Sequence, residues 1–149
     1  MTSDFYVSPG LEVSFAKTVG ESDVYLFAGI TGDLSSNHVN DQVMSQSKYG
    51  RRIAHGALLV GFMSTSSTRM IETYGGAAEG KATAVSLGYN GVRFLAPVFI
   101  GDTIHVSYRV TRVERERDRS YGEISVTNQD GTRVAVAEHI MKWVPIDRP

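Results

Sequence analysis

One long segment of small and apolar residues constrains the fold more than any other feature of this chain. The segment GALLVGFMSTSSTRMIET, residues 56–73, has apolar or small side chains on nearly every side of its first half, which predicts a buried helix. A helix of that length spans about 27 Å. Residues 64–68 form helices poorly, so something beyond propensity must favour the helix there. Gly75 and Gly76 are expected to end it.

The sequence after this segment has the character of strands. Residues 104–110 alternate apolar and polar side chains with a period of two, and the stretch before them is rich in β-branched and aromatic residues. Turn-forming residues at 128–131 predict a hairpin between the last two strands. Four strands are therefore expected, over or around residues 82–98, 104–110, 124–126 and 134–143.

A strand and a short helix are predicted ahead of the long helix. Residues 11–19, LEVSFAKTV, alternate as a half-buried strand does, and residues 21–31 repeat apolar side chains at helical spacing. Thr18 and Glu21 have the spacing of a capping box, which would start this helix. Gly32 stands where a glycine would end it.

Composition limits the class of protein. The 149 residues are 42% apolar and 21% charged, as in an ordinary globular domain, and one long helix against an antiparallel sheet is an α+β arrangement. We expect a single domain, residues 1–149. A net charge of −1 supplies no field that would attract nucleic acid or an anionic membrane. The absence of cysteine and of an apolar leader in MTSDFYVSPG leads us to expect a cytoplasmic protein.

A polar segment between the two predicted helices carries a carboxylate and an imidazole. In GITGDLSSNHVND, residues 29–41, His38 follows Asp33 by five residues, in the loop expected to leave the first helix. Such a pair can hold a water molecule, take its proton and give a proton to a neighbouring carbon. Alternatively, Asp33 only caps local amides and His38 is an ordinary surface residue. Spacing alone leaves both interpretations open.

The start of the long helix offers a hydrogen-bond donor. In IAHGALL, residues 53–59, Gly56 opens the helix, so its N–H lacks an intrahelical partner and lies at the positive end of the helix dipole. Such an N–H can polarise a thioester carbonyl; alternatively, the glycine only permits close packing. We interpret His55 as structural. The four histidines show no paired-ligand spacing, so no metal is expected.

Together, FAGITGDLSSNHVN and RIAHGALLVGFMS resemble the MaoC-like, (R)-specific enoyl-CoA hydratase family of hot-dog proteins. In that family a helix ends in Gly-Asp, followed by Asn-Pro and a histidine, and an Ile-x-His-Gly-Met/Ala-Leu segment opens the central helix. The stretch YNGVRFLAPVFIGDTI, residues 89–104, is similar to the strand and turn that come after it. The similarity runs from about residue 13 to about residue 144.

The resemblance implies a hot-dog domain, with an antiparallel sheet wrapped around the central helix, that reversibly hydrates trans-2-enoyl thioesters to (R)-3-hydroxyacyl thioesters without a cofactor. Asp33 and His38 match the catalytic pair. Gly56 matches the glycine whose N–H binds the thioester oxygen, and Ser64 matches a serine near the carboxylate and water. The substrate would be an acyl-CoA or an acyl carrier protein thioester. The resemblance also implies a homodimer, or a dimer or trimer of dimers.

One departure from the family pattern falls inside the polar segment. Ser35 and Ser36 stand where the family usually has asparagine and proline. The family asparagine braces this loop, so the bracing has to come from another residue here. Asn37 is the candidate for that role.

Two other functions are open to a chain with this fold. A hot-dog thioesterase normally carries its carboxylate on the central helix, but no Asp or Glu lies between Gly56 and Ile71. A non-catalytic acyl-thioester-binding subunit would lack the acid/base pair, which is present here. The stretch RVERERDRS, residues 112–120, could meet CoA phosphates, but alternating charges are also typical of a solvated hairpin.

Overall fold

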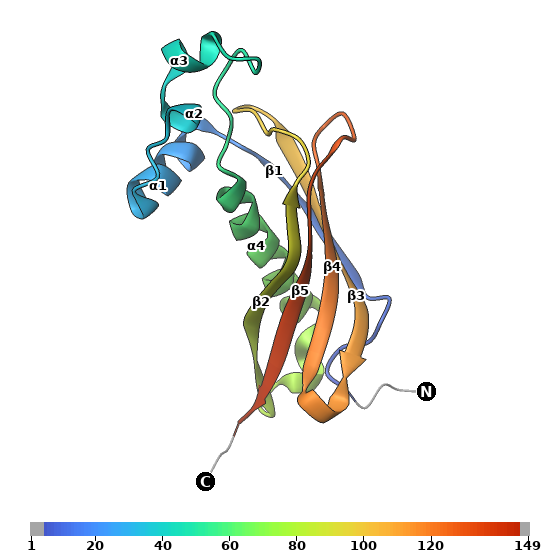
Figure 1. Cartoon of the computed structure of the whole chain (residues 1–149). Coiled ribbons are helices and arrows are strands. Elements are labelled where there is room, and N and C mark those ends of the chain that lie inside the picture. Colours follow the sequence, from blue (N-terminus) through green and yellow to red (C-terminus); the bar gives the residue numbers. More distant parts are fainter. Residues whose placement is uncertain (1–4, 147–149) are drawn as a thin grey trace.

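The computed structural model describes residues 5–146; residues 1–4 and 147–149, the two ends of the predicted domain, lie outside it. A five-stranded antiparallel sheet curls around a long helix, α4 (Figure 1). The elements in chain order are β1 (Glu12–Thr18), α1 (Glu21–Thr31), α2 (Ser36–Val39), α3 (Asp41–Ser45), α4 (Gly56–Tyr74), η1 (Gly75–Ala78), β2 (Ala82–Phe94), β3 (Thr103–Glu114), η2 (Arg115–Arg117), β4 (Arg119–Thr127) and β5 (Arg133–Pro145). The strand order β1-β3-β4-β5-β2 makes β1 and β2 the edges. The predicted α+β fold is confirmed.

The central helix is buried on one face only. Leu59, Met63 and Met70 pack into the core with the inward-facing side chains of the sheet, among them Ile104 and Val106 of β3. The opposite face is exposed because the sheet of a single chain covers one side of the helix; it includes Ala57, Gly61, Ser64, Thr65 and Thr68. The predicted burial of the first half of the helix on nearly every side is therefore wrong at Ala57 and Gly61. Among the described residues, no helix has both the length and the hydropathy of a membrane span.

The polar run inside α4 is satisfied locally. The hydroxyl of Ser66 donates to the carbonyl oxygen of Met63 at 2.6 Å, and that of Ser67 donates to the carbonyl oxygen of Ser64 at 2.8 Å. Both serines are buried. The weak helix propensity of this run is therefore overcome by burial together with hydrogen bonds back to the helix itself.

The first helix ends as predicted but begins differently. Gly32 has φ 79° and its N–H donates to the Ala28 carbonyl at 2.8 Å, a left-handed cap that suits glycine. At the other end, the N–H of Gly20 donates to the Asp23 carboxylate at 2.8 Å, so the predicted Thr18–Glu21 capping box is wrong. Thr18 instead belongs to β1, where its hydroxyl lies 2.7 Å from that of Thr103 on β3.

A histidine lies in the middle of the sheet with its ring fully buried. His139 on β5 places Nδ1 3.1 Å from the Tyr108 hydroxyl and Nε2 2.8 Å from the Ser86 hydroxyl. Tyr108 reaches His139 from β3 across Gly122 of β4, where a β-carbon would overlap the tyrosine ring. Burial lowers the pKa of His139 to about 4, so the ring is neutral near pH 7.

This buried histidine predicts a loss of stability in acid. In the unfolded chain His139 binds a proton near pH 6.5, whereas in the folded chain it does so only near pH 4. Between those values the unfolded state alone takes up the proton, so the free energy of unfolding falls by up to about 1.4 kcal/mol per pH unit as pH decreases; above this window the group contributes no slope. We expect urea titrations from about pH 7.5 to about pH 4.5 to show this slope in the wild type but not in His139→Gln. Equal pH dependence in the two proteins would contradict it.

Candidate active site

Three short helices carry the polar segment to one end of the sheet. α1, α2 and α3 lie beyond the sheet, beside the amino-terminal end of α4 (Figure 1). Asp33 follows the reversal at Gly32, as expected. His38 does not lie in a loop as expected, because residues 36–39 form the single helical turn α2.

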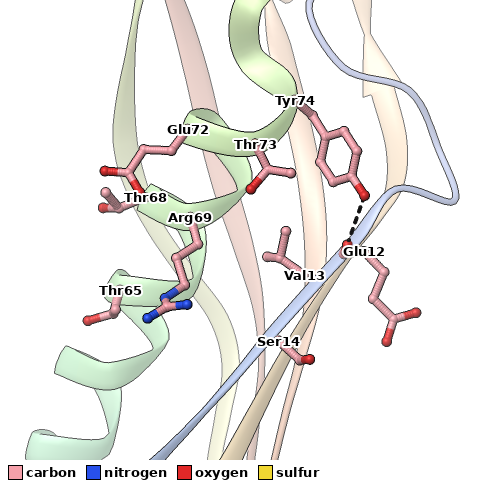
Figure 2. A pocket seen from close by; sticks show the side chains of 9 residues that line it. All are labelled: Glu12, Val13, Ser14, Thr65, Thr68, Arg69, Glu72, Thr73 and Tyr74. Carbon is pink, nitrogen blue, oxygen red and sulfur yellow. Dashed lines mark hydrogen bonds between the residues drawn. The ribbon is translucent and has the colours of Figure 1, made fainter.

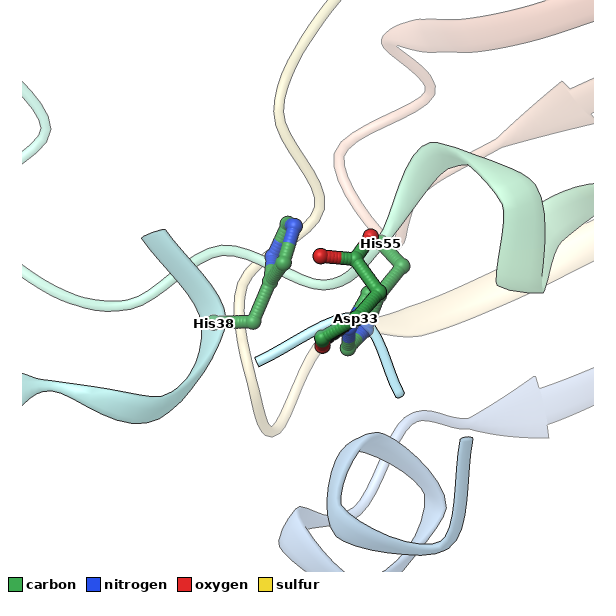
Figure 3. A group of neighbouring side chains, drawn as sticks. All are labelled: Asp33, His38 and His55. Carbon is green, nitrogen blue, oxygen red and sulfur yellow. Dashed lines mark hydrogen bonds between the residues drawn. The ribbon is translucent and has the colours of Figure 1, made fainter. Parts of the chain in front are cut away.

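Asp33, His38 and His55 come together at the start of α4 (Figure 3). A carboxylate oxygen and one nitrogen of each ring lie within 4.8 Å of one another. The rings of His38 and His55 stack, with centroids 3.7 Å apart and planes inclined by 27°. Both rings are buried, whereas Asp33 is exposed. The folded chain thus juxtaposes the two residues singled out from the sequence and adds His55 to them.

The hydrogen bonds of the two rings define what each can do. Nδ1 of His38 lies 2.7 Å from the carbonyl oxygen of Ile53, so in the neutral ring Nδ1 donates and Nε2 keeps its lone pair for another partner. Nε2 of His55 lies 3.0 Å from the carbonyl oxygen of Asp33 and donates to it. The remaining nitrogen of His55 is buried without a partner among residues 5–146. His55 therefore holds the backbone of Asp33, which agrees with its interpretation as structural.

The polar segment is braced by backbone groups in place of the family's asparagine. The N–H of Ile53 donates to the carbonyl oxygen of Asn37 at 3.0 Å, so Asn37 takes part through its main chain. The Asp33 carboxylate accepts the N–H of Ser35 at 3.3 Å. This long contact is the local cap of the alternative interpretation, and it leaves the exposed carboxylate accessible to a second partner.

A cavity of about 280 Å³ connects His38 with Gly56. Apart from His38 and Tyr49 its lining is apolar or glycine. A β-carbon on Gly56 would lie 2.6 Å from the ring of Phe94, so the close-packing role of this glycine is confirmed. As the first residue of α4, Gly56 also keeps an N–H that no carbonyl of the helix can accept. The two roles proposed for Gly56 are compatible.

Ser64 stands apart from this cluster within one chain. It lies eight residues after Gly56, about 12 Å further along the helix axis, on the exposed face of α4. Burial raises the pKa of Tyr89 on β2, and hydrogen bonding to the hydroxyls of Ser64 and Ser86 partly offsets that effect. Ser64 therefore faces the edge strand β2, and its contact with the carboxylate of Asp33 stays a prediction.

The geometry of the cluster suits proton transfer better than metal binding. Imidazole binds a metal ion through a lone pair in the plane of its ring. Because the rings of His38 and His55 are stacked, with planes inclined by only 27°, their in-plane lone pairs lie in two nearly parallel planes and do not meet at the ~2 Å distance of a metal–nitrogen bond. One nitrogen of each ring is also already bonded to a backbone carbonyl.

A second, larger groove lies elsewhere on the molecule. It runs between β1 and the second half of α4, has a volume of about 600 Å³, and includes Arg69 and Glu72 in its lining (Figure 2). The Tyr74 hydroxyl donates to the Glu12 carbonyl oxygen across it at 3.4 Å. None of the residues singled out from the sequence lines this groove, so we place the candidate site in the smaller cavity.

The basic stretch at residues 112–120 lies far from Asp33 within the chain. Its turn, η2, is at the end of the sheet opposite to α1, α2 and α3 (Figure 1). Arg112 pairs with Glu114 at 2.8 Å and with Glu138 at 3.6 Å, and its guanidinium lies over the ring of Tyr121. These contacts favour the solvated hairpin over a phosphate site.

One residue at the site was missed by the sequence analysis. Arg52 is buried beneath the three short helices and pairs with Glu21 and Asp41. Its signal in the sequence was a cationic side chain directly before the apolar run of residues 53–60. The partners could not be identified, because they lie 31 and 11 residues away along the chain.

Comparison with known proteins gives the family. Residues 5–132 match the model of the MaoC like domain. The chain is 35% identical over 111 residues to the (R)-specific enoyl-CoA hydratase of Rhodospirillum rubrum, covering 74% of this chain and 71% of that protein. It is 31% identical over 136 residues to the 3-hydroxybutyryl-CoA dehydratase of Methylorubrum extorquens, covering 91% and 80%. The chain belongs to the MaoC-like dehydratase family, as its resemblance predicted.

The fold of the family is seen in solved structures. The (R)-hydratase of Aeromonas caviae involved in PHA biosynthesis superposes on this chain with a TM-score of 0.80, at 22% identity, covering 91% of this chain and 96% of that one. A hot-dog-like protein from Thermanaerovibrio acidaminovorans superposes with a TM-score of 0.65, at 19% identity, covering 97% and 87%. The predicted hot-dog fold is confirmed.

Proposed function

We propose that this chain catalyses the reversible hydration of trans-2-enoyl thioesters, in the first place CoA thioesters, to (R)-3-hydroxyacyl thioesters. The observation that carries the proposal is the juxtaposition of an exposed carboxylate, Asp33, with an imidazole, His38, beside a cavity that the helix-opening Gly56 also lines. The two curated relatives described above are named for this reaction class. A hydro-lyase of this kind needs no cofactor.

The surroundings of Gly56, Asp33 and His38 allow each of them one role in the hydration. The thioester oxygen accepts the Gly56 N–H, so that negative charge building on that oxygen is stabilised by the amide and the helix dipole. Asp33 takes a proton from the water whose oxygen bonds to C3. The proton that C2 gains comes either from Asp33, while neutral His38 holds the water through Nε2, or from protonated His38, which is then reprotonated with the proton that Asp33 took. Ser64, on the exposed face of α4, is proposed as a further contact to the water or substrate.

The observations weigh against the two alternative functions. The first carboxylate on α4 is Glu72, near the end of the helix and in the second groove, which does not suit a hot-dog thioesterase. A non-catalytic binding subunit would not need an accessible carboxylate beside an imidazole with a free nitrogen. Loss of activity on removing either group separates catalysis from binding alone.

Asp33→Asn and His38→Gln should each leave the fold intact and lower kcat by about 10²-fold or more, the scale of a lost general acid or base. The double variant should cost far less than the product of the single effects, because both groups act on one water. Hydration is measured by the loss of enone absorbance over a panel of enoyl thioesters. Glu116→Gln and His105→Gln, exposed residues away from the cluster, are the matched controls. Near-normal turnover in either site variant would refute the assignment.

The role of the Gly56 N–H can be isolated from its packing. Both alanine and proline at this position add the β-carbon that meets Phe94, so the two variants should be compared in a Phe94→Ala background. Proline is tolerated at the first position of a helix, and the extended backbone of His55 suits a following proline. We expect Gly56→Pro to raise the barrier by about 2.7–4 kcal/mol relative to Gly56→Ala, as a lost oxyanion donor does. Equal kcat in the two folded proteins would leave Gly56 with a packing role only.

We also propose that two chains pair through β2 to form a homodimer, alone or as the unit of a dimer or trimer of dimers. β2 is an edge strand of 13 residues that exposes Val85 and Leu87, and a long apolar edge left unpaired invites association. Pairing there would also approach the exposed face of α4 that carries Ser64. A cytoplasmic location stays a prediction from the sequence.

Sedimentation at micromolar concentration should give the mass of a dimer or of a multiple of it. Leu87→Lys, which places a charge on the proposed interface, should shift the protein toward the monomer. A wild-type chain that sediments as a monomer and is active in that form would contradict this prediction.

A further inference from the structure

Arg52 makes an unusual set of contacts for a residue outside the proposed chemistry. Its side chain is only 8% exposed. Nε donates to the Asp41 carboxylate at 2.7 Å, and one terminal nitrogen pairs with the Glu21 carboxylate. The other terminal nitrogen donates to the Tyr25 hydroxyl at 3.1 Å and to the carbonyl oxygen of His38 at 3.4 Å.

These partners belong to all three short helices. Glu21 and Tyr25 lie in the first two turns of α1, His38 lies on α2, and Asp41 opens α3. α2 and α3 contain only four and five residues, far fewer than an isolated helix needs to be stable in water. Their positions therefore depend on contacts to other parts of the chain, and Arg52 supplies a contact to each of the three helices.

Ile53, the residue after Arg52, also forms hydrogen bonds to the turn that carries His38. The carbonyl oxygen of Ile53 accepts the ring Nδ1–H of His38, and the N–H of Ile53 donates to the carbonyl oxygen of Asn37. Arg52 holds the main chain of His38 while Ile53 holds its ring. Because residues 52–53 lie four and three positions ahead of Gly56, where α4 begins, the ring and the backbone of His38 are both tied to the segment that leads into the central helix.

The chemistry of the guanidinium explains why arginine is suited to this place. Its planar group presents five N–H donors in fixed directions, whereas the ammonium of lysine offers three from one point. Hydrogen bonds to Glu21 and then to Asp41 raise the pKa of Arg52 above its ordinary value, so the charge persists at every physiological pH. Removing that charge would leave Glu21 and Asp41, whose side chains are 53% and 75% exposed, without the partner that joins them.

We propose that Arg52 is a positioning residue, which sets His38 against Asp33 by tying α1, α2 and α3 to the start of α4. The geometric part of this inference stands on the contacts of Arg52 alone. Its kinetic consequence rests on the proposed function.

The geometric part is tested without any substrate. The Nδ1–H of His38, bonded to the Ile53 carbonyl, should give a slowly exchanging ring-proton NMR signal, assigned by its loss in His38→Gln. We expect the signal to broaden or vanish in Arg52→Met although the fold persists by circular dichroism. Arg112→Met is the matched control, since Arg112 also pairs with two carboxylates and lies over a tyrosine, but at the far end of the sheet. An unchanged His38 signal in folded Arg52→Met would overturn the proposal.

The kinetic part uses the same proteins. Arg52→Met and Arg52→Lys should lower kcat by about 10- to 100-fold, as small displacements of a catalytic group do, with a smaller change in KM, while Arg112→Met keeps the wild-type kcat. If Arg52→Met does not fold, Glu21→Gln and Asp41→Asn retain the arginine and each remove one tie; each should show a partial loss of kcat and of the His38 signal. Normal kcat and an unchanged signal in those variants would overturn the inference. A wild type inactive on every enoyl thioester would refute the proposed function and leave the NMR result to decide on Arg52.

Discussion

The geometry of the candidate site depends on hydrogen bonds from the residues immediately before α4. Ile53 bonds to the ring of His38 and to the backbone of Asn37, and His55 bonds to the backbone of Asp33. These residues lie where they do because α4 buries Leu59 and Met63 in the core of the sheet. Apolar packing thus fixes the position of α4, and a few hydrogen bonds from the residues ahead of α4 then fix Asp33 and His38. The segment that carries these two residues buries few apolar side chains.

The sheet with α4 forms the rigid part of the molecule, and the segment of α1, α2 and α3 carries the proposed catalytic residues Asp33 and His38. The sheet and α4 form a continuous apolar core, in which even the polar His139 has both ring nitrogens bonded. The helices α1 and α3 expose large apolar side chains, among them Leu26, Ile30 and Val43, and all three short helices are contacted by polar groups such as Arg52. Segments with few buried apolar contacts open more easily than a core does, so the polar ties determine how well Asp33 and His38 are held.

Two surfaces of the chain are of the kind that another molecule covers. The outward face of α4 carries small and hydroxylated side chains, including Gly61 and Ser64, and β2 leaves a long strand edge beside it. The cavity beside His38 and Gly56 opens among apolar side chains, which suits an acyl chain better than a charged ligand. The proposed dimer would therefore cover the β2 edge and the outward face of α4, whereas the proposed substrate would occupy the cavity.

The sequence by itself determined the features that depend on neighbours along the chain. The length of α4, the glycine cap at Gly32 and the alternation of β3 follow from side-chain period and backbone preference, which are local properties. Asp33, His38 and Gly56 could be singled out because their motifs are short and continuous. Tertiary structure alone decided that Thr18 does not cap α1, since its hydroxyl lies against that of Thr103 on β3, while the Asp23 carboxylate accepts the N–H of Gly20. It also decided the stack of His38 on His55 and the partners of Arg52, because burial and long-range hydrogen bonds place residues together that the sequence keeps apart.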